Sequence, residues 1–389
     1  MSAPPAATVR VAVKYRLYPT RAQATQLAQT LETCRRLYNR FLAERKANYE
    51  QTGTAPSYYN QKRALPAWKT ESAWLRRANA QALQDVALRV ERAFAAFFRR
   101  VKAGGEKAGY PRFKGQDWYD SFTLPQEGAF RTHNDGVTLS KIGRVRAVVH
   151  RPLPGRAKTL TVRRQNGKWY ACVACEVVPA QKLLPVSAER IALDVGLTHF
   201  ATTDTGERIA NPRFFRTDQH ALAKAQRRLA KGGKGTPTRR RRRKVVARIH
   251  ERIRNRRHDF AHQQARRLVD RYGLIAVEDL NVAGMVKNHA LAKSISDAAW
   301  SQFRTVLTYK AASAGRVVVA VPPAYTSQRC SGCQELVPKT LSERVHACPH
   351  CGLLLDRDHN AALNLLALAV GLHGGGTQPT EAPAFRPGE

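Results

Sequence analysis

The chain has 389 residues, enough for two or three domains that each bury an apolar core. Its 66 lysines and arginines exceed its 29 aspartates and glutamates by 37, and a net charge of +37 points to nucleic acid, because a polyanion relieves self-repulsion of this size. An anionic membrane is a poor alternative, since the sequence lacks both an apolar run of about 18 residues and a polybasic segment beside one.

The N-terminal residues 1–9 lack the apolar core of a secretory signal and are expected to form a disordered tail. We therefore expect a cytoplasmic, nucleoid-associated protein whose cysteines stay reduced. From Val9 onward, apolar residues alternate with basic ones at the period of a strand. One face of this strand is basic and is a candidate for nucleic-acid contacts, through Arg10, Lys14 and Arg16.

Thr20 and Gln23 then form a capping box, and helical periodicity predicts an all-helical segment over residues 20–108. Strand patterns follow, and Gln165-Asn166-Gly167-Lys168 predicts a two-residue hairpin. We expect residues 10–19 and 109–185 to form one β domain, which the helices interrupt. Cys172 and Cys175 of this domain point to opposite faces of a strand, so they are expected to pack, like Cys34, rather than to bind metal.

The second half of the chain predicts an α/β arrangement. Residues 190–209 indicate an apolar strand, a turn at Asp204 to Gly206 and a returning strand, and LIAVEDL indicates a buried parallel strand. Between them lie two helical arms that GGKGTPT separates, and from Lys224 to Arg257 they carry sixteen basic residues but only one acid, Glu251. Such runs are often only solvated helix faces. The alternative is phosphate contact, with these candidates: Arg239, Arg240, Arg241, Arg242, Arg243, Arg252 and Arg256.

Four cysteines, Cys330, Cys333, Cys348 and Cys351, form two C-x2-C turns with fourteen residues between them. Two such turns can direct four thiolates at one tetrahedral zinc ion. The alternative is four unrelated buried cysteines. Four thiolates would leave no open coordination position, so the pattern predicts a structural zinc and not a catalytic one.

Three acids stand where α/β nucleases place metal ligands: Asp194 late in a strand, Glu278 at the end of another, and Asp358 in the first turn of a helix. Each also has a structural interpretation, as a turn former, a surface charge and an N-cap, respectively. Asp356 rivals Asp358, and spacing alone does not choose between them.

Several segments, in this order, resemble the TnpB family of transposon-encoded RNA-guided DNA endonucleases, which is related to type V CRISPR effectors. They are YRLYPT at 15–20, GYPRFK at 109–114, LDVGL at 193–197, VEDLN at 277–281, SISDAAW at 294–300, YTSQRCSGC at 325–333 and CPHCGLLLDRDHNAALN at 348–364. The resemblance implies a multi-domain α+β fold. Its first part would be a split, wedge-type β-barrel with a helical recognition insert. Its second would be a RuvC, RNase H-like nuclease domain at 186–325 and 354–370, with a zinc-ribbon target-loading module at 326–353 and a disordered tail at 371–389.

The same resemblance assigns catalysis to Asp194, Glu278 and Asp358, which would hold two Mg²⁺ or Mn²⁺ ions, and it assigns zinc to the four cysteines. It also implies a guide RNA from the protein's own locus and cleavage of double-stranded DNA beside a short target-adjacent motif. Two alternatives stay open: a protein-only RNase H-like transposase, and an RNA-guided repressor that binds without cutting. No oligomeric state follows from the sequence.

Overall fold

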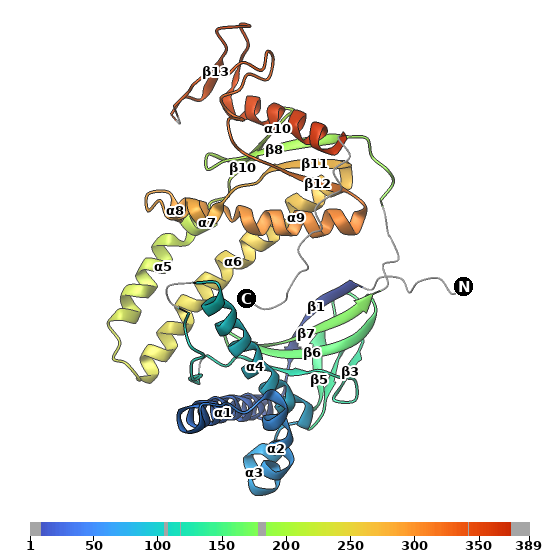
Figure 1. Ribbon diagram of the computed structural model, residues 1–389, viewed down its shortest axis with the longest axis vertical. Coiled ribbons are helices and arrows are strands. Elements are labelled where there is room, and N and C mark those ends of the chain that lie inside the picture. The colour runs from blue at the N-terminus through green and yellow to red at the C-terminus, as the bar shows by residue number, and fades with distance from the viewer. Residues whose placement is uncertain (1–8, 105–107, 117, 178–183, 341, 375–389) are drawn as a thin grey trace, which may run out of the picture. The chain divides into compact units, whose positions relative to one another are not determined.

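The computed structural model describes residues 9–104, 108–116, 118–177, 184–340 and 342–374. They belong to two compact units, residues 1–180 and residues 181–389 (Figure 1). The predicted tails fall outside the described residues except at their inner ends, Val9 and residues 371–374. Among the helices described, none has both the length and the hydropathy that crossing a membrane requires.

The first unit contains a seven-stranded antiparallel sheet in the order β2-β6-β7-β1-β5-β4-β3. Its strands are β1 (Val9–Tyr18), β2 (Ser121–Leu124), β3 (Phe130–His133), β4 (Gly136–Leu139), β5 (Gly143–Val148), β6 (Arg156–Gln165) and β7 (Lys168–Val177). Strand β1 lies between β5 and β7, so the sheet joins residues from both sides of the helical segment. Over the described residues the edge strands β2 and β3 do not pair, so hydrogen bonding does not close the predicted barrel.

Local signals predicted two features of this sheet correctly. In β1, Val13, Tyr15 and Leu17 are buried, whereas Arg10 and Lys14 are exposed. The hairpin between β6 and β7 places Asn166 at φ 50° and Gly167 at φ 78°, the left-handed conformations that a tight turn of this type requires.

Four helices separate β1 from β2: α1 (Arg21–Thr52), α2 (Tyr58–Glu71), α3 (Ala73–Arg76) and α4 (Ala80–Lys102). The predicted capping box is present, because the Thr20 hydroxyl accepts from the Gln23 N–H at 3.3 Å and the Gln23 side chain accepts from the Thr20 N–H at 3.1 Å. Helices α1 and α4 share a core with the sheet, in which Phe41 and Leu83 are fully buried.

The second unit contains a five-stranded sheet in the order β10-β9-β8-β11-β12. Its strands are β8 (Arg190–Val195), β9 (His199–Thr203), β10 (Arg208–Ala210), β11 (Leu274–Glu278) and β12 (Val317–Val321). The strands β8, β11 and β12 run parallel, and β9 and β10 extend the sheet antiparallel. The predicted turn at Asp204 to Gly206 is present and leads into the returning strand β10. The prediction of one strand before it was wrong, because a second turn after Val195 divides that segment into β8 and β9.

Helices cover both faces of this sheet. The helices described in this unit are α5 (Phe214–Ala230), α6 (Pro237–Arg271), α7 (Val282–Met285), α8 (Ala292–Ala298), α9 (Trp300–Ala314) and α10 (Arg357–Gly374). The helices α6 and α9 pack against one face through residues such as Leu268 and Leu307, and α10 packs against the other through Leu365 and Ala369. The tail predicted from residue 371 was wrong at its start, because residues 371–374 still belong to α10.

A short hairpin of β13 (Val345–Ala347) and β14 (Leu354–Asp356) precedes α10. The predicted module boundary after residue 353 cuts through this hairpin, since β14 pairs with β13 and not with the large sheet. Strand β14 therefore belongs with the cysteine segment.

Candidate active site and metal centre

Asp194 and Glu278 lie at the carboxyl ends of neighbouring parallel strands. Leu193 of β8 is in register with Val277 of β11, so the acid that follows each residue reaches the same edge of the sheet. Both Leu193 and Val277 are buried, which fixes the strand ends. Ligands of open α/β sheets collect at this edge.

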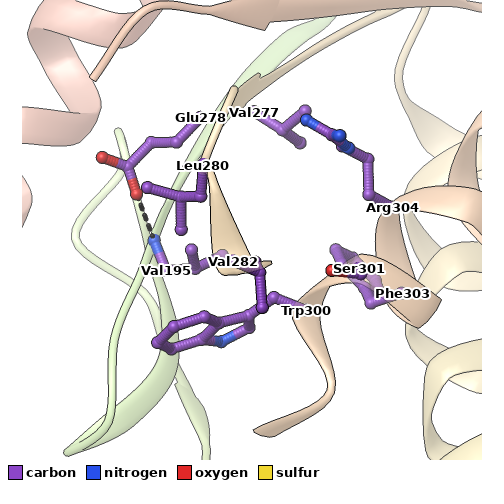
Figure 2. A pocket seen from close by; sticks show the side chains of 9 residues that line it. All are labelled: Val195, Val277, Glu278, Leu280, Val282, Trp300, Ser301, Phe303 and Arg304. Carbon is purple, nitrogen blue, oxygen red and sulfur yellow. Dashed lines mark hydrogen bonds between the residues drawn. The ribbon is translucent and has the colours of Figure 1, made fainter. Parts of the chain in front are cut away.

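The two acids interact strongly. Burial raises the pKa of Asp194 well above its usual value, and the negative charges of Glu278 and Asp358 raise it further. Burial also raises the pKa of Glu278 to about 7, although the Val195 N–H, 3.4 Å from Glu278 Oε2, opposes the shift (Figure 2). Buried neighbouring carboxyl groups resist ionising together, so the pair favours either a shared proton or a bound cation.

An apolar pocket borders Glu278, which is half-buried (Figure 2). Arg304, at the rim, forms an ion pair with Asp279 rather than with Glu278. Glu278 is the acidic residue among those that line the pocket. The lining residues are Val195, Val277, Glu278, Leu280, Val282, Trp300, Ser301, Phe303 and Arg304.

Asp358 is the second residue of α10, which packs across β8 and β11. Its Oδ1 accepts from Arg357 Nε at 3.1 Å and Nη2 at 3.0 Å, and its Oδ2 lies 3.9 Å from Arg344 Nη1. Because its charge raises the pKa of both Asp194 and Glu278, the three acids form one electrostatic cluster.

Asp356, the rival of Asp358, has a structural task. Its Oδ1 accepts from the N–H groups of Asp358 at 2.9 Å and His359 at 3.2 Å, which are free donors of the first turn of α10. Its Oδ2 accepts from Arg208 at 2.9 Å. Asp356 is thus engaged in capping the helix, whereas the charge of Asp358 acts on both Asp194 and Glu278, so the structure favours Asp358.

Sequence reasoning missed two supports of this site, Asp204 and His359. His359 Nε2 lies 2.9 Å from the Asp204 carbonyl, and Asp204 Oδ1 accepts from the Ala192 N–H of β8 at 2.7 Å. These bonds tie the start of α10 to the strand that carries Asp194. Asp204 carried only a turn signal in the sequence.

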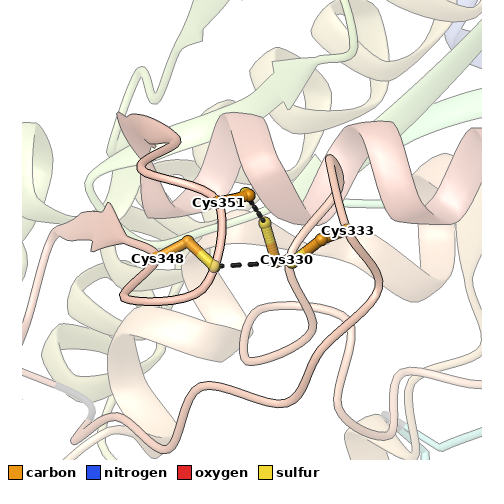
Figure 3. A group of neighbouring side chains, drawn as sticks. All are labelled: Cys330, Cys333, Cys348 and Cys351. Carbon is orange, nitrogen blue, oxygen red and sulfur yellow. Dashed lines mark hydrogen bonds between the residues drawn. The ribbon is translucent and has the colours of Figure 1, made fainter.

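The four predicted cysteines come together (Figure 3). All four sulfur atoms lie within 4.8 Å of one another, with 3.6 Å between Cys330 and Cys351 and 3.5 Å between Cys333 and Cys348. Four sulfurs at about 2.3 Å from one tetrahedral zinc would be about 3.8 Å apart. The cluster therefore fits a zinc ion with little adjustment.

Two asparagines of α10 hold the first cysteine turn. Asn360 is 0% exposed; it accepts from the Ser331 N–H at 2.9 Å and donates to the Arg329 carbonyl at 2.8 Å. Asn364 is 3% exposed and donates to the carbonyls of Thr326 at 2.9 Å and Arg329 at 2.7 Å. Their spacing of four residues places them on one helix face, a signal that was readable in the sequence. The helix that carries Asp358 is thus also hydrogen-bonded to the cysteine segment.

The other cysteines do not join this cluster. Cys34 and Cys175 are fully buried in the core of the first unit, and Cys172 lies on the opposite face of β7 from Cys175. The described residues contain one group of metal-ligating side chains of this kind, formed by the four predicted cysteines.

Asp297, in the SISDAAW segment, is a further residue whose role sequence reasoning missed. It is 6% exposed, and its carboxylate accepts from the backbone N–H of Phe215 at 2.9 Å and of Arg216 at 3.3 Å. Arg257 of α6 also donates to it at 2.8 Å. Asp297 thus caps α5 from another helix and anchors the two basic arms to the core of the second unit.

The basic face of β1 carries aromatic neighbours. Lys14 Nζ lies 4.2 Å from the centre of the Tyr170 ring, and the Arg16 guanidinium lies 5.2 Å from it. Arg10 and Lys14 are exposed, and Arg16 is half-buried. Cations beside aromatic rings suit nucleic acid, and contact through these three residues stays a prediction.

Two arginines of the predicted run join the arms to each other. Arg239 Nη1 donates to the carbonyls of Leu229 at 3.1 Å and Gly232 at 2.7 Å, and Arg242 Nη1 donates to Arg228 at 2.7 Å. These bonds satisfy carbonyls at the end of α5. Arg239 and Arg242 therefore have a structural task that the sequence did not indicate.

Arg252 and Arg256 are also engaged within the chain, since both pair with the buried carboxylate of Asp218, at 2.9 and 3.5 Å. Arg240, Arg241 and Arg243 of the run are exposed, and their contact with phosphate stays a prediction.

We expect the double change Arg240→Gln and Arg241→Gln to weaken nucleic-acid binding for all sequences alike, because phosphate contacts do not read bases. Two lost contacts should reduce the slope of log K against log salt by about 1.4 to 1.8. Filter binding across a salt series measures this. In the matched control, Arg239→Gln with Arg242→Gln, the unfolding temperature should fall instead. An unchanged slope in the first variant would remove Arg240 and Arg241 from the interface.

Three segments of the chain match known families. Residues 172–289 match OrfB_IS605, described as "Probable transposase", and residues 300–365 match "Cas12f1-like, TNB domain". Residues 9–54 match a family described as "Helix-turn-helix domain". In the structure these last residues form β1 and the single long helix α1, so that description does not fit their fold here.

Close relatives extend over nearly the whole chain. "Putative RNA-guided DNA endonuclease" of Streptomyces pristinaespiralis is 36% identical over 383 residues, covering 95% of this chain and 92% of the relative. "Putative RNA-guided DNA endonuclease InsQ" of Escherichia coli (strain K12) is 32% identical over 374 residues, covering 92% and 91%. The structure "Cryo-EM structure of the Cas12f1-sgRNA-target DNA complex" shares the fold, with a TM-score of 0.55 at 13% identity over 92% of this chain and 98% of that chain.

Proposed function

The chain belongs to the TnpB family, and on this premise we propose that it is an RNA-guided DNA endonuclease whose catalytic residues are Asp194, Glu278 and Asp358. The proposal is supported by two observations: Asp194 and Glu278 end neighbouring parallel strands at one edge of an α/β sheet, and the charge of Asp358 acts on both of them. The 36% identical relative is matched over 92% of its length, so the proposal concerns the whole protein.

The acid cluster suits hard divalent cations. Carboxylate oxygens are the ligands that Mg²⁺ and Mn²⁺ prefer. The pKa values of Asp194 and Glu278 are raised first by burial and then by neighbouring negative charge, and a bound cation would stabilise the ionised carboxylates against both effects. Two such ions would supply an activated water and a stabilised leaving oxygen. The chain itself holds Asp194 and Glu278 side by side on paired strands and orients Asp358 through Arg357.

The cysteine cluster is proposed to hold one structural zinc ion. Burial acts to raise the pKa of Cys348, but the N–H groups of Cys351 and His350 outweigh it and lower that pKa to about 6. A backbone hydrogen bond at Glu335 acts to lower the pKa of Cys333, but burial and hydrogen bonds with the other thiols outweigh it and raise that pKa to about 12. A zinc ion would therefore have to displace protons from some of the thiols when it binds. With four thiolates the ion has no open position, so its contribution is to the fold of residues 326–356 and, through Asn360 and Asn364, to α10.

We propose a guide RNA from the protein's own transposon locus as the main partner of the basic surface. A net charge of +37 suits an RNA together with an RNA–DNA heteroduplex, which a protein holds by backbone and shape while base pairing reads the sequence. The protein would read only a short target-adjacent motif on double-stranded DNA. The names of both relatives agree with this partner.

Changing the guide segment of the bound RNA should redirect cleavage to a new DNA site beside the same short motif, without any change in the protein. The test is to purify the protein with its RNA, exchange the guide and map the cut sites by sequencing. Cutting of the original site by RNA-free protein would instead indicate a protein-only transposase. Guided binding without any cut, under Mg²⁺ and Mn²⁺, would indicate an RNA-guided repressor.

A further inference from the structure

We propose that His258, His262 and Tyr309 form a surface site for a divalent transition-metal ion, separate from both the carboxylates and the cysteines. His258 and His262 are four residues apart on α6, so their side chains leave the same face of the helix. Paired histidines at this spacing are a recurrent way for a helix to bind zinc. Tyr309 comes from the neighbouring helix α9.

The donor atoms already lie at the spacing that a common ligand requires. His258 Nε2 and His262 Nε2 are 3.2 Å apart, and Tyr309 Oη is 3.3 Å from His262 Nε2. Two nitrogens at about 2.1 Å from one tetrahedral ion are about 3.4 Å apart. A metal ion could therefore replace the present hydrogen bonds with little movement of the side chains.

The packing of α6 against α9 holds in place the backbone that carries the two histidines and Tyr309. Ala261 and Ala265 of α6 and Val306 of α9 are buried in the shared core, and they alternate along the helices with the three donors. His258 and Tyr309 are exposed and His262 is half-buried, so an ion can enter from solvent. The ion would bridge two helices of the second unit.

The chemistry of the donors selects the ion. Imidazole nitrogens bind Zn²⁺, Ni²⁺ and Cu²⁺ well and Mg²⁺ poorly, and a phenol oxygen is a third, weaker donor. Three protein donors leave room for water in the coordination sphere. The site would therefore take a borderline transition-metal ion while Mg²⁺ occupies the carboxylates.

Nickel is a suitable probe, because it can be counted separately from the cysteine-bound zinc. Full-length, zinc-loaded protein is dialysed against Ni²⁺ in excess Mg²⁺, and both metals are then measured by elemental analysis. We expect one nickel per chain more in the wild type than in the double variant His258→Gln with His262→Gln, at an unchanged zinc content. Each single change should weaken nickel binding by at least about tenfold, the smallest effect that even an outer-shell change produces.

The matched control is His250→Gln, since His250 is exposed on the same helix but outside the cluster. It should bind nickel like the wild type, and Tyr309→Phe should bind it more weakly. Ni²⁺ should raise the unfolding temperature of the wild type but not of the double variant. Equal nickel in the wild type and the double variant would overturn the site, and an unchanged affinity in Tyr309→Phe would exclude Tyr309 from it.

Discussion

Asp194→Ala, Glu278→Ala and Asp358→Ala are each expected to abolish DNA cleavage while guided DNA binding persists. Removing one ligand from a metal cluster takes away several kcal/mol of transition-state stabilisation, so the rate should fall by about a thousandfold or more. The basic residues that we expect to contact nucleic acid do not include these acids. Single-turnover cleavage with Mg²⁺, beside an electrophoretic binding assay on the same samples, measures both effects.

Asp356→Ala is the matched control for Asp358→Ala, because the two acids are close in sequence but do different work. Asp356 caps α10, and losing an N-cap costs about 0.5 to 2 kcal/mol of stability. We expect a lower unfolding temperature and a modest loss of cleavage. An inactive Asp356→Ala protein beside an active Asp358→Ala protein would reverse the assignment.

Much of the local structure was predictable because its signals are local. Alternation identified β1, since a strand with one buried face repeats every two residues, and the Asn166-Gly167 pair identified the β6–β7 hairpin. The prediction for residues 190–209 missed one strand because the local signal was absent there. In β9 the residues from Phe200 to Thr203 are all buried, so no alternation marked it as a separate strand.

The order of strands was not predictable in this way. Strand β1 pairs with β5 and β7, which follow it only after four helices, and no local pattern encodes that pairing. Similarly, the open sheet order of the first unit depends on which strands remain unpaired at its edges. These are properties of contacts between distant segments.

In the candidate site, too, local features were predictable from the sequence and contacts between distant residues were not. Residue types and spacing indicated the three acids and the four cysteines, but spacing could not separate Asp356 from Asp358. The difference lies in neighbours that only the fold supplies: Arg208 for Asp356, and Asp194 with Glu278 for Asp358. Asp297 lies in the SISDAAW segment, but nothing in that segment indicated that it caps α5, a helix distant in sequence.

Loss of the zinc ion is expected to stop cleavage as well as to unfold the cysteine segment. A structural zinc contributes about 10 to 16 kcal/mol of apparent binding energy, whereas the buried core here is small: Cys330, Val337 and Cys348, with Cys333 and Leu353 packed against it. Cys330→Ser should therefore lose the metal and the fold of the segment. Asn360 and Asn364 would lose their partners, at about 1 to 3 kcal/mol for each buried group. Elemental analysis and cleavage assays measure the two losses.

Cys172→Ser is the control for this change, since Cys172 shares the C-x2-C pattern but lies in β7, and it should keep one zinc per chain and full activity. A zinc-free Cys330→Ser protein that cleaves at the wild-type rate would show that α10 is placed independently of the metal. Unchanged zinc in Cys330→Ser would instead refute the assignment of the cluster.

Asn364→Ala separates the fold of the zinc segment from the placement of Asp358. All four cysteines remain in this variant, so zinc should be retained. However, α10 loses the two bonds that Asn364 donates to the carbonyls of Thr326 and Arg329, and it keeps the bond from Asn360 to Arg329. Because Asp358 lies at the start of the same helix, we expect slower cleavage and a higher Mg²⁺ requirement, with guided DNA binding unchanged. A variant that merely loses stability would show a lower unfolding temperature at an unchanged Mg²⁺ requirement. A shift in that requirement would therefore link the zinc segment to the catalytic carboxylate through α10.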